Sequence, residues 1–276
     1  MRKGLTNLLL LTITVFLISC SGGEKPEEII SEDEKTGNDS ERNRFNVQTV
    51  FSSLPDRDMV LQLIAENQLN YEPDFLNDPQ SVNRYALEDA KAVNLGIYGS
   101  DLSIASSFDQ TQESMIFLKC VNSLATQLGV SNAFDQKVVE RIEANQNQKD
   151  SVIGIVTNAF KKVDEILKTN NRPATAAVIL SGCWIEGLFV SCQIAQSANA
   201  ESAIKAILGQ KESLQNVIAM LESVKLNKEA EFILTGLQKL LVEFDSAEST
   251  TKYDKKAIAE ISRSISELRN LCIKVA

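Results

Sequence analysis

The sequence predicts an all-α protein, folded as a single multi-helix bundle of about eight to nine helices over residues 45–276. Beyond residue 79 the chain contains one proline, Pro173, and few clusters of turn-forming residues. Apolar residues recur at helical spacing, most clearly in a C-terminal stripe formed by Ile258, Ile261, Ile265, Leu268 and Cys272. The apolar runs 152–156 and 176–180 have the composition of buried strands, but no glycine or proline bounds them at strand spacing. We therefore expect helices there too.

In chain order, we expect helices at 56–68, 81–107, 109–129, 132–144, 150–169, 173–197, 201–224, 228–244 and 254–273. Asp109 and Gln112 have the spacing of a capping box, which predicts that the third helix begins there.

Residues 71–79, YEPDFLNDP, form a loop whose oxygen-bearing side chains are Glu72, Asp74, Asn77 and Asp78. Calcium prefers such ligands, but their spacing is not that of an EF-hand. We interpret this loop as a solvated turn.

Two of the expected helices differ from the rest. Residues 94–107 and 179–192 are apolar on most faces and are rich in glycine, serine and alanine. A helix that is apolar all round lies in the interior of a protein, and small residues allow neighbouring backbones to approach closely. We therefore expect these two helices to form the centre of the bundle.

Each central helix carries an aromatic residue followed closely by one acid. On the first helix Asp101 shares a face with Asn94 and Tyr98; on the second, Trp184 precedes Glu186, which shares a face with Cys183 and Gln193. A carboxylate in an apolar helix must be paired, hydrogen-bonded or protonated. The candidate ligand-binding residues are Asn94, Tyr98, Asp101, Trp184, Glu186 and Gln193. Asp101 and Glu186 would serve as acid and base or bind a cation or amine; the alternative is a satisfied structural network.

Composition restricts the chemistry. The chain has no histidine, which excludes serine–histidine and cysteine–histidine catalysis and removes the commonest ligand of zinc, copper and iron. No phosphate-binding loop or dinucleotide fingerprint is present, and we expect neither a metal nor a cofactor. The net charge of −9 makes nucleic acid an unsuitable partner.

Beyond Cys20 there are four cysteines, and no two of them form a C-x-x-C pair. We expect them to be buried free thiols, although an oxidising compartment would permit disulfides.

The N-terminus has the pattern of a secretion signal. Arg2 and Lys3 precede about a dozen mostly apolar residues, a small residue and Cys20. The last four residues of this stretch, LISC at 17–20, resemble the lipobox of bacterial lipoproteins. That resemblance implies cleavage after residue 19, a diacylglycerol thioether on Cys20 and permanent attachment to a lipid bilayer. An ordinary secretory signal with an incidental cysteine is the alternative.

Residues 20–44 are expected to form a disordered acidic tether between the anchor and the domain at 45–276. Residues 24–44 contain eight acids and four bases with hardly any apolar residue. By resemblance to lipoprotein sorting signals, Ser21 after the cysteine favours the outer membrane. Glu27 and Glu28 loosely resemble a signal for display on the outside of the cell, although a plain solvated spacer has the same composition. We expect the cell envelope, on either face of the outer membrane.

From residue 54 to 196 the chain resembles uncharacterised helical lipoproteins of Bacteroidota, through the stretch from DFLNDP at 74–79 to SGCWIEGL at 181–188. No known activity comes with that resemblance. The chain is only loosely similar to envelope lipoproteins of the imelysin type, whose metal motif needs a histidine. We expect a non-enzymatic binding or interaction module with an envelope protein or a small ligand as partner. The alternative is a carboxylate-based hydrolase or lyase that uses Asp101 and Glu186.

Overall fold

The structure is a computed structural model that describes residues 71–198, 201–248 and 255–274. Within these ranges the chain is all-α and contains no strand, which confirms the predicted fold class. The predicted signal, the tether, Cys20 and the helix at 56–68 lie outside the described residues. The helices are α3 (Glu88–Ser107), α4 (Thr111–Gln127), α5 (Gln136–Ala144), α6 (Lys149–Thr169), α7 (Pro173–Ala198), α8 (Glu201–Leu208), α9 (Lys211–Glu222), α10 (Glu231–Glu248) and α11 (Lys255–Ile273). Short 3₁₀ turns are η1 (Pro73–Phe75), η2 (Pro79–Ser81) and η3 (Ser131–Phe134).

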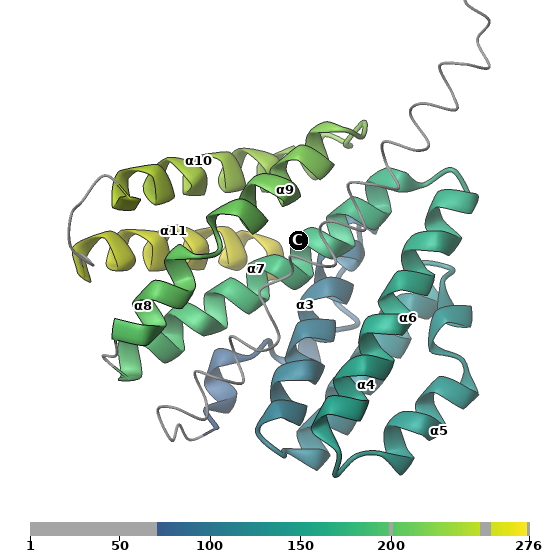
Figure 1. The fold of residues 1–276 in the computed structure, drawn as a ribbon. Coiled ribbons are helices and arrows are strands. Elements are labelled where there is room, and N and C mark those ends of the chain that lie inside the picture. The colour runs from purple at the N-terminus through teal and green to yellow at the C-terminus, as the bar shows by residue number, and fades with distance from the viewer. Residues whose placement is uncertain (1–70, 199–200, 249–254, 275–276) are drawn as a thin grey trace, which may run out of the picture.

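Helices α3 and α7 occupy the centre of the bundle. In Figure 1, α4, α5 and α6 lie on one side of this pair and α8 to α11 lie on the other. α7 contacts α6, α8, α9 and α11, and α3 contacts α4, α6 and α11. The predicted central position of these two helices is confirmed. α7 is also the one helix of the described residues that is long and apolar enough to cross a membrane, but nearly all of its apolar stretch is buried inside the bundle.

The contact between α3 and α7 is made backbone to backbone at two glycines. A Cβ atom on Gly96 would lie 2.0 Å from the carbonyl oxygen of Ile179, and one on Gly182 would lie 2.1 Å from the carbonyl oxygen of Val93. Such distances are far below van der Waals contact, and the obstructing atoms are main-chain atoms of the opposite helix. The small residues of the two central helices therefore set the distance between them.

Three predicted boundaries are wrong. The helix expected at 81 begins at Glu88, because Asp78 caps the single turn η2 and Leu87 has an extended backbone. The helix expected at 201–224 is divided into α8 and α9 at Gly209, a poor helix former. The segment expected as one helix from 132 contains the turn η3, after which Asp135 caps α5.

The predicted capping box at Asp109 and Gln112 is also wrong. Asp109 has a left-handed backbone with a φ of 58°, and the amide of Gln110 donates to the carbonyl of Ala105. This is the pattern of a Schellman motif, which closes the preceding helix. Asp109 therefore ends α3, and Gln110 occupies the N-cap position of α4 without a side-chain cap.

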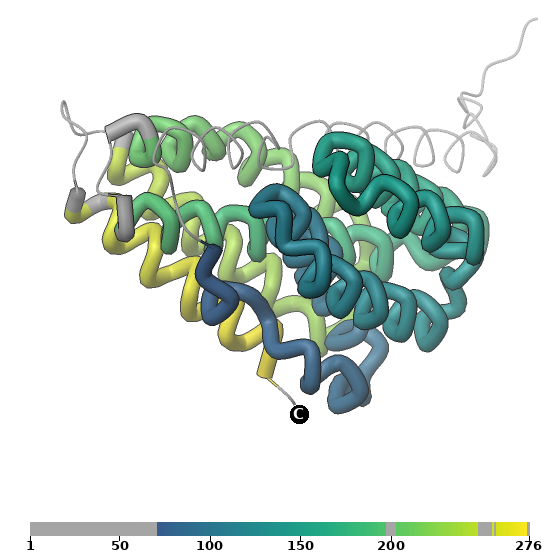
Figure 2. Tube along the Cα trace, turned by 90° about the horizontal axis from the view of Figure 1, so that it is seen from below, coloured from purple at the N-terminus to yellow at the C-terminus, as the bar shows by residue number. Residues whose placement is uncertain are grey.

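Residues 71–82 form an irregular segment that we call the strap. It contains η1 and η2 and runs across the surface beside α3 and the end of α11, as the blue end of the described chain in Figure 2 shows. Leu76, Asn77, Ser81 and Val82 of the strap are buried. The interpretation of 71–79 as a solvated turn is therefore wrong for Leu76 and Asn77, whereas Glu72, Asp74 and Asp78 are exposed.

Candidate functional site

Glu186 of α7 forms a buried ion pair with Arg269 of α11. The guanidinium donates from Nε to Glu186 Oε2 and from Nη2 to Oε1, both at 2.7 Å. Glu186 is fully enclosed and the Arg269 side chain is only 7% exposed. The guanidinium also lies 4.3 Å from the centre of the Phe189 ring and donates from Nη2 to the carbonyl of Phe75 at 3.3 Å. The bidentate geometry and the additional partners offset part of the cost of burying both charges.

Asp101 of α3 is also fully enclosed and lies close enough to this ion pair to interact electrostatically with both Glu186 and Arg269. Its Oδ2 accepts a hydrogen bond from the amide of Asn77 at 3.2 Å. Its Oδ1 accepts no hydrogen bond from any described residue. Burial raises the pKa of Asp101 well above its usual value, and the negative charge of Glu186 raises it further; Arg269 partly opposes this. A hydrogen bond between the Asp101 and Glu186 side chains, which requires a proton on one of the two carboxyl groups, raises the pKa of Asp101 as well. The arrangement therefore favours the neutral form of Asp101.

Asn94 and Tyr98, on the same face of α3 as Asp101, hold the strap. Asn77 Nδ2 donates to Asn94 Oδ1 at 3.2 Å, and the Tyr98 hydroxyl donates to the carbonyl of Asp78 at 2.7 Å. Asn94 in turn donates from Nδ2 to the carbonyl of Cys272 at the end of α11, at 2.8 Å. These contacts connect the strap, α3 and α11 in one buried network of polar side chains.

The structure brings Asn94, Tyr98, Asp101 and Glu186 together and leaves the two other predicted residues apart. The indole Nε1 of Trp184 donates to the hydroxyl of Ser213 on α9 at 2.9 Å, and this places the ring on a different face of α7 from Glu186. Gln193 lies two turns further along α7 and is only partly buried. Trp184 is therefore a core residue at the contact with α9.

Sequence reasoning did not include Arg269 among the site residues, and it placed Asn77 in a solvated turn rather than in the site. Arg269 carried a readable signal, since it lies four residues after Ile265 and three before Cys272 and so falls on the apolar stripe of the last helix. Asn77 had no such signal, because its burial depends on partners 17 and 24 residues away in α3.

The enclosed carboxylates have little scope for chemistry on a substrate. Asp101, Glu186 and Asn94 have no exposed surface, and Glu186 already uses both oxygens on Arg269. Among the residues that the structure describes, no group of three or more cysteine, aspartate or glutamate side chains lies close enough to hold a metal ion. The four described cysteines are free thiols, and burial raises the pKa of Cys120 to about 11.

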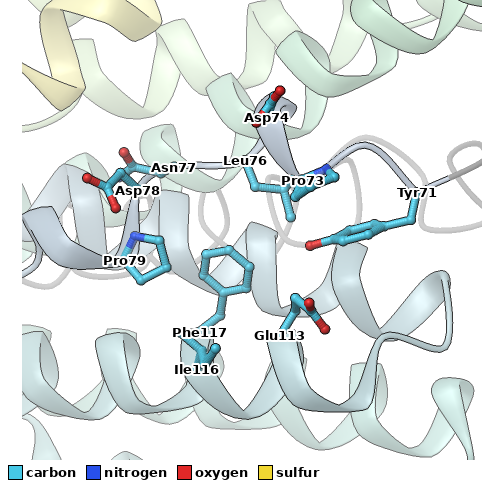
Figure 3. Close-up of a pocket in the computed structure, with 10 residues that line it drawn as sticks. All are labelled: Tyr71, Pro73, Asp74, Leu76, Asn77, Asp78, Pro79, Glu113, Ile116 and Phe117. Atoms are coloured by element: carbon cyan, nitrogen blue, oxygen red, sulfur yellow. The ribbon is translucent and has the colours of Figure 1, made fainter.

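An open pocket lies on the outer side of the strap. It has a volume of about 450 Å³ and lies between strap residues 71–79 and one face of α4. Glu113, Ile116 and Phe117 form the α4 wall, and Figure 3 shows these side chains opposite Tyr71 and Pro73. We call this pocket the strap groove. Asn77 belongs both to the groove and to the buried network behind it.

No known protein family, curated protein or solved structure matches this chain.

Proposed function

We propose that the chain is a lipid-anchored protein of the cell envelope whose helical domain acts as a non-enzymatic binding or interaction module. The non-enzymatic role is supported above all by one observation: Glu186 is paired through both oxygens with Arg269, beside an enclosed Asp101. A general acid or base must come within hydrogen-bonding reach of its substrate, and the side chains of Asp101 and Glu186 have no exposed surface that a substrate could contact. Their role in this proposal is to fasten the strap and α11 to the central helices.

The anchoring part of the proposal is supported by the N-terminal pattern. The LISC stretch that ends at Cys20 resembles a lipobox, and the acidic residues at 24–44 suit a solvated spacer between membrane and domain. An anchor of two or three acyl chains binds a bilayer far more strongly than one chain. The partner of the anchor is the lipid bilayer, and the outer membrane is the expected location.

Labelling with palmitate tests the anchor. Wild-type protein expressed in a bacterial host should incorporate labelled palmitate and fractionate with membranes, whereas Cys20→Ser should incorporate none and accumulate as the longer precursor, because the thioether cannot form. Cys120→Ser, which removes a buried thiol far along the chain, is the control and should be labelled like wild type. Unlabelled wild-type protein would end the lipoprotein proposal.

The second candidate function is a carboxylate-based hydrolase or lyase. The raised pKa of Asp101 next to Glu186 favours it, since two carboxyl groups with separated pKa values are typical of acid–base pairs. Purified protein screened against envelope glycans and esters would decide. Turnover that Asp101→Asn abolishes would contradict the non-enzymatic role and support this second function.

A further inference from the structure

The strap groove has the size of a small-molecule site. Its volume of about 450 Å³ falls in the range of pockets that bind compact organic ligands. Figure 3 shows the rings of Tyr71 and Phe117 and the side chain of Glu113 turned toward the space between the strap and α4. Aromatic side chains of the strap and of α4 therefore form two walls of the groove.

Much of the groove wall is apolar. Phe117 is buried at its base, and Ile116 beside it is 44% exposed, which makes it one of few large apolar side chains with that much exposure in the described residues. The Tyr71 ring packs on the ring of Phe108, with the two ring centres 5.7 Å apart. A ligand with an apolar body would cover this surface.

The charged groups of the groove all have the same sign. Asp74, Asp78 and Glu113 line it, and no lysine or arginine does. Glu113 is half-buried, yet neither its carboxylate nor the Tyr71 hydroxyl has a hydrogen bond or ion pair with any described residue. Burial and the negative charge of Glu113 raise the pKa of Tyr71 to about 12. A cation would relieve this negative potential and would also be attracted to the faces of the aromatic rings.

The strap wall of the groove is held in place before any ligand arrives. The amide of Asn77 is bonded to Asp101, and the carbonyl of Asp78 is bonded to Tyr98, at 3.2 and 2.7 Å. A wall that is already ordered loses little conformational entropy on binding. The buried network therefore positions the ligand-binding surface without contacting the ligand.

We propose that the strap groove binds a small organic ammonium ion, with its apolar or aromatic body between Tyr71, Ile116 and Phe117 and its charged nitrogen at Glu113. This inference rests on the proposed binding role and assigns a site and a ligand class to it. Charge complementarity distinguishes this occupant from an anionic or neutral one, and the volume of the groove suits one compact molecule.

The test uses three probes of matched shape and different charge: 2-phenylethylammonium, 2-phenylethanol and phenylacetate. Each is titrated into the ¹⁵N-labelled full chain in maltoside micelles, and amide shifts are followed by NMR. The ammonium probe should shift amides of residues 71–79 and 111–117 and bind about tenfold more tightly than the alcohol, and phenylacetate should shift none. Glu113→Gln should weaken the ammonium complex about tenfold, whereas Glu165→Gln, an exposed control on α6, should not change it.

Four results would overturn the proposal. They are equal affinities for the three probes, no shift in these residues at about 10 mM ammonium, an unchanged affinity in Glu113→Gln, and contacts between Phe117 and residues 45–70 in the ligand-free protein. The last result would mean that the chain's own segment fills the groove. None of them affects palmitate labelling at Cys20 or the search for turnover, which test the proposed function separately.

Discussion

Replacing Arg269 by methionine is expected to lower the free energy of unfolding by about 3 to 5 kcal/mol. The change leaves Glu186 in the core without its counter-charge and removes the donor to the carbonyl of Phe75. Thermal and denaturant unfolding followed by circular dichroism would measure the loss. A loss of this size is a large part of the total stability of about 5 to 15 kcal/mol that is usual for a domain.

Two controls separate the lost ion pair from general damage to α11. Arg263→Met removes an exposed arginine of the same helix, 3.8 Å from Glu267, and should cost less than about 1 kcal/mol. The double variant Glu186→Leu with Arg269→Met should recover much of the stability that Arg269→Met loses, because it leaves no unpaired charge in the core. Equal losses in Arg263→Met and Arg269→Met would contradict the role of the buried pair.

Replacing Gly96 by alanine is expected to destabilise the domain by about 3 kcal/mol or more. The new methyl group would lie 2.0 Å from the carbonyl oxygen of Ile179 and 2.7 Å from the amide nitrogen of Cys183, so α3 and α7 must move apart along their whole contact. Gly154→Ala on α6 is the matched control, because nothing lies within 4 Å of its Cβ position. It should be neutral or stabilising by up to about 1 kcal/mol, since alanine is the better helix former.

Chemical denaturation of both glycine variants would measure these differences. Similar stabilities for Gly96→Ala and Gly154→Ala would mean that the two central helices are not in backbone contact. A melting temperature of Gly96→Ala well below that of wild type, with helical content retained at low temperature, is the expected result.

The helical fold was predictable because local signals agree with the tertiary structure over most of the chain. The stripe of Ile258, Ile261 and Ile265 predicts one buried face of α11, and all three residues are buried. The small residues of 94–107 and 179–192 predicted close helix packing, which Gly96 and Gly182 provide.

The errors occurred where a backbone conformation depends on tertiary contacts. Aspartate is a common N-cap residue, but Asp109 has the left-handed backbone conformation that ends α3. The strap has the composition of a solvated turn, yet Asn77 is only 4% exposed because Asp101 and Asn94 supply its partners. The sequence indicated the two carboxylates but not Arg269. The pairing of Glu186 with Arg269 and the attachment of the strap could therefore be recognised only in the structure.

Asp101 is a buried carboxyl group whose neutral form is favoured in the folded protein, where its role is structural. In the unfolded chain an aspartate ionises near pH 3.8, whereas the pKa of Asp101 in the folded protein is raised, so above that pH the folded state holds a proton that the unfolded state has lost. The stability of wild type should therefore fall as pH rises from about 4 toward the folded pKa, by up to about 1.4 kcal/mol per pH unit from this group.

Asp101→Asn tests the neutral form of Asp101, because the amide is uncharged like the protonated acid and retains an oxygen that can accept from the amide of Asn77. The free energy of unfolding of both proteins should be measured by urea denaturation from about pH 4 to pH 8, where the ionisations that they share cancel in the difference. We expect the variant to be as stable as wild type near pH 4 and increasingly more stable as pH rises. A variant that is less stable than wild type by the same amount at every pH would show that Asp101 is ionised in the folded protein, and would contradict its assignment as a neutral structural group.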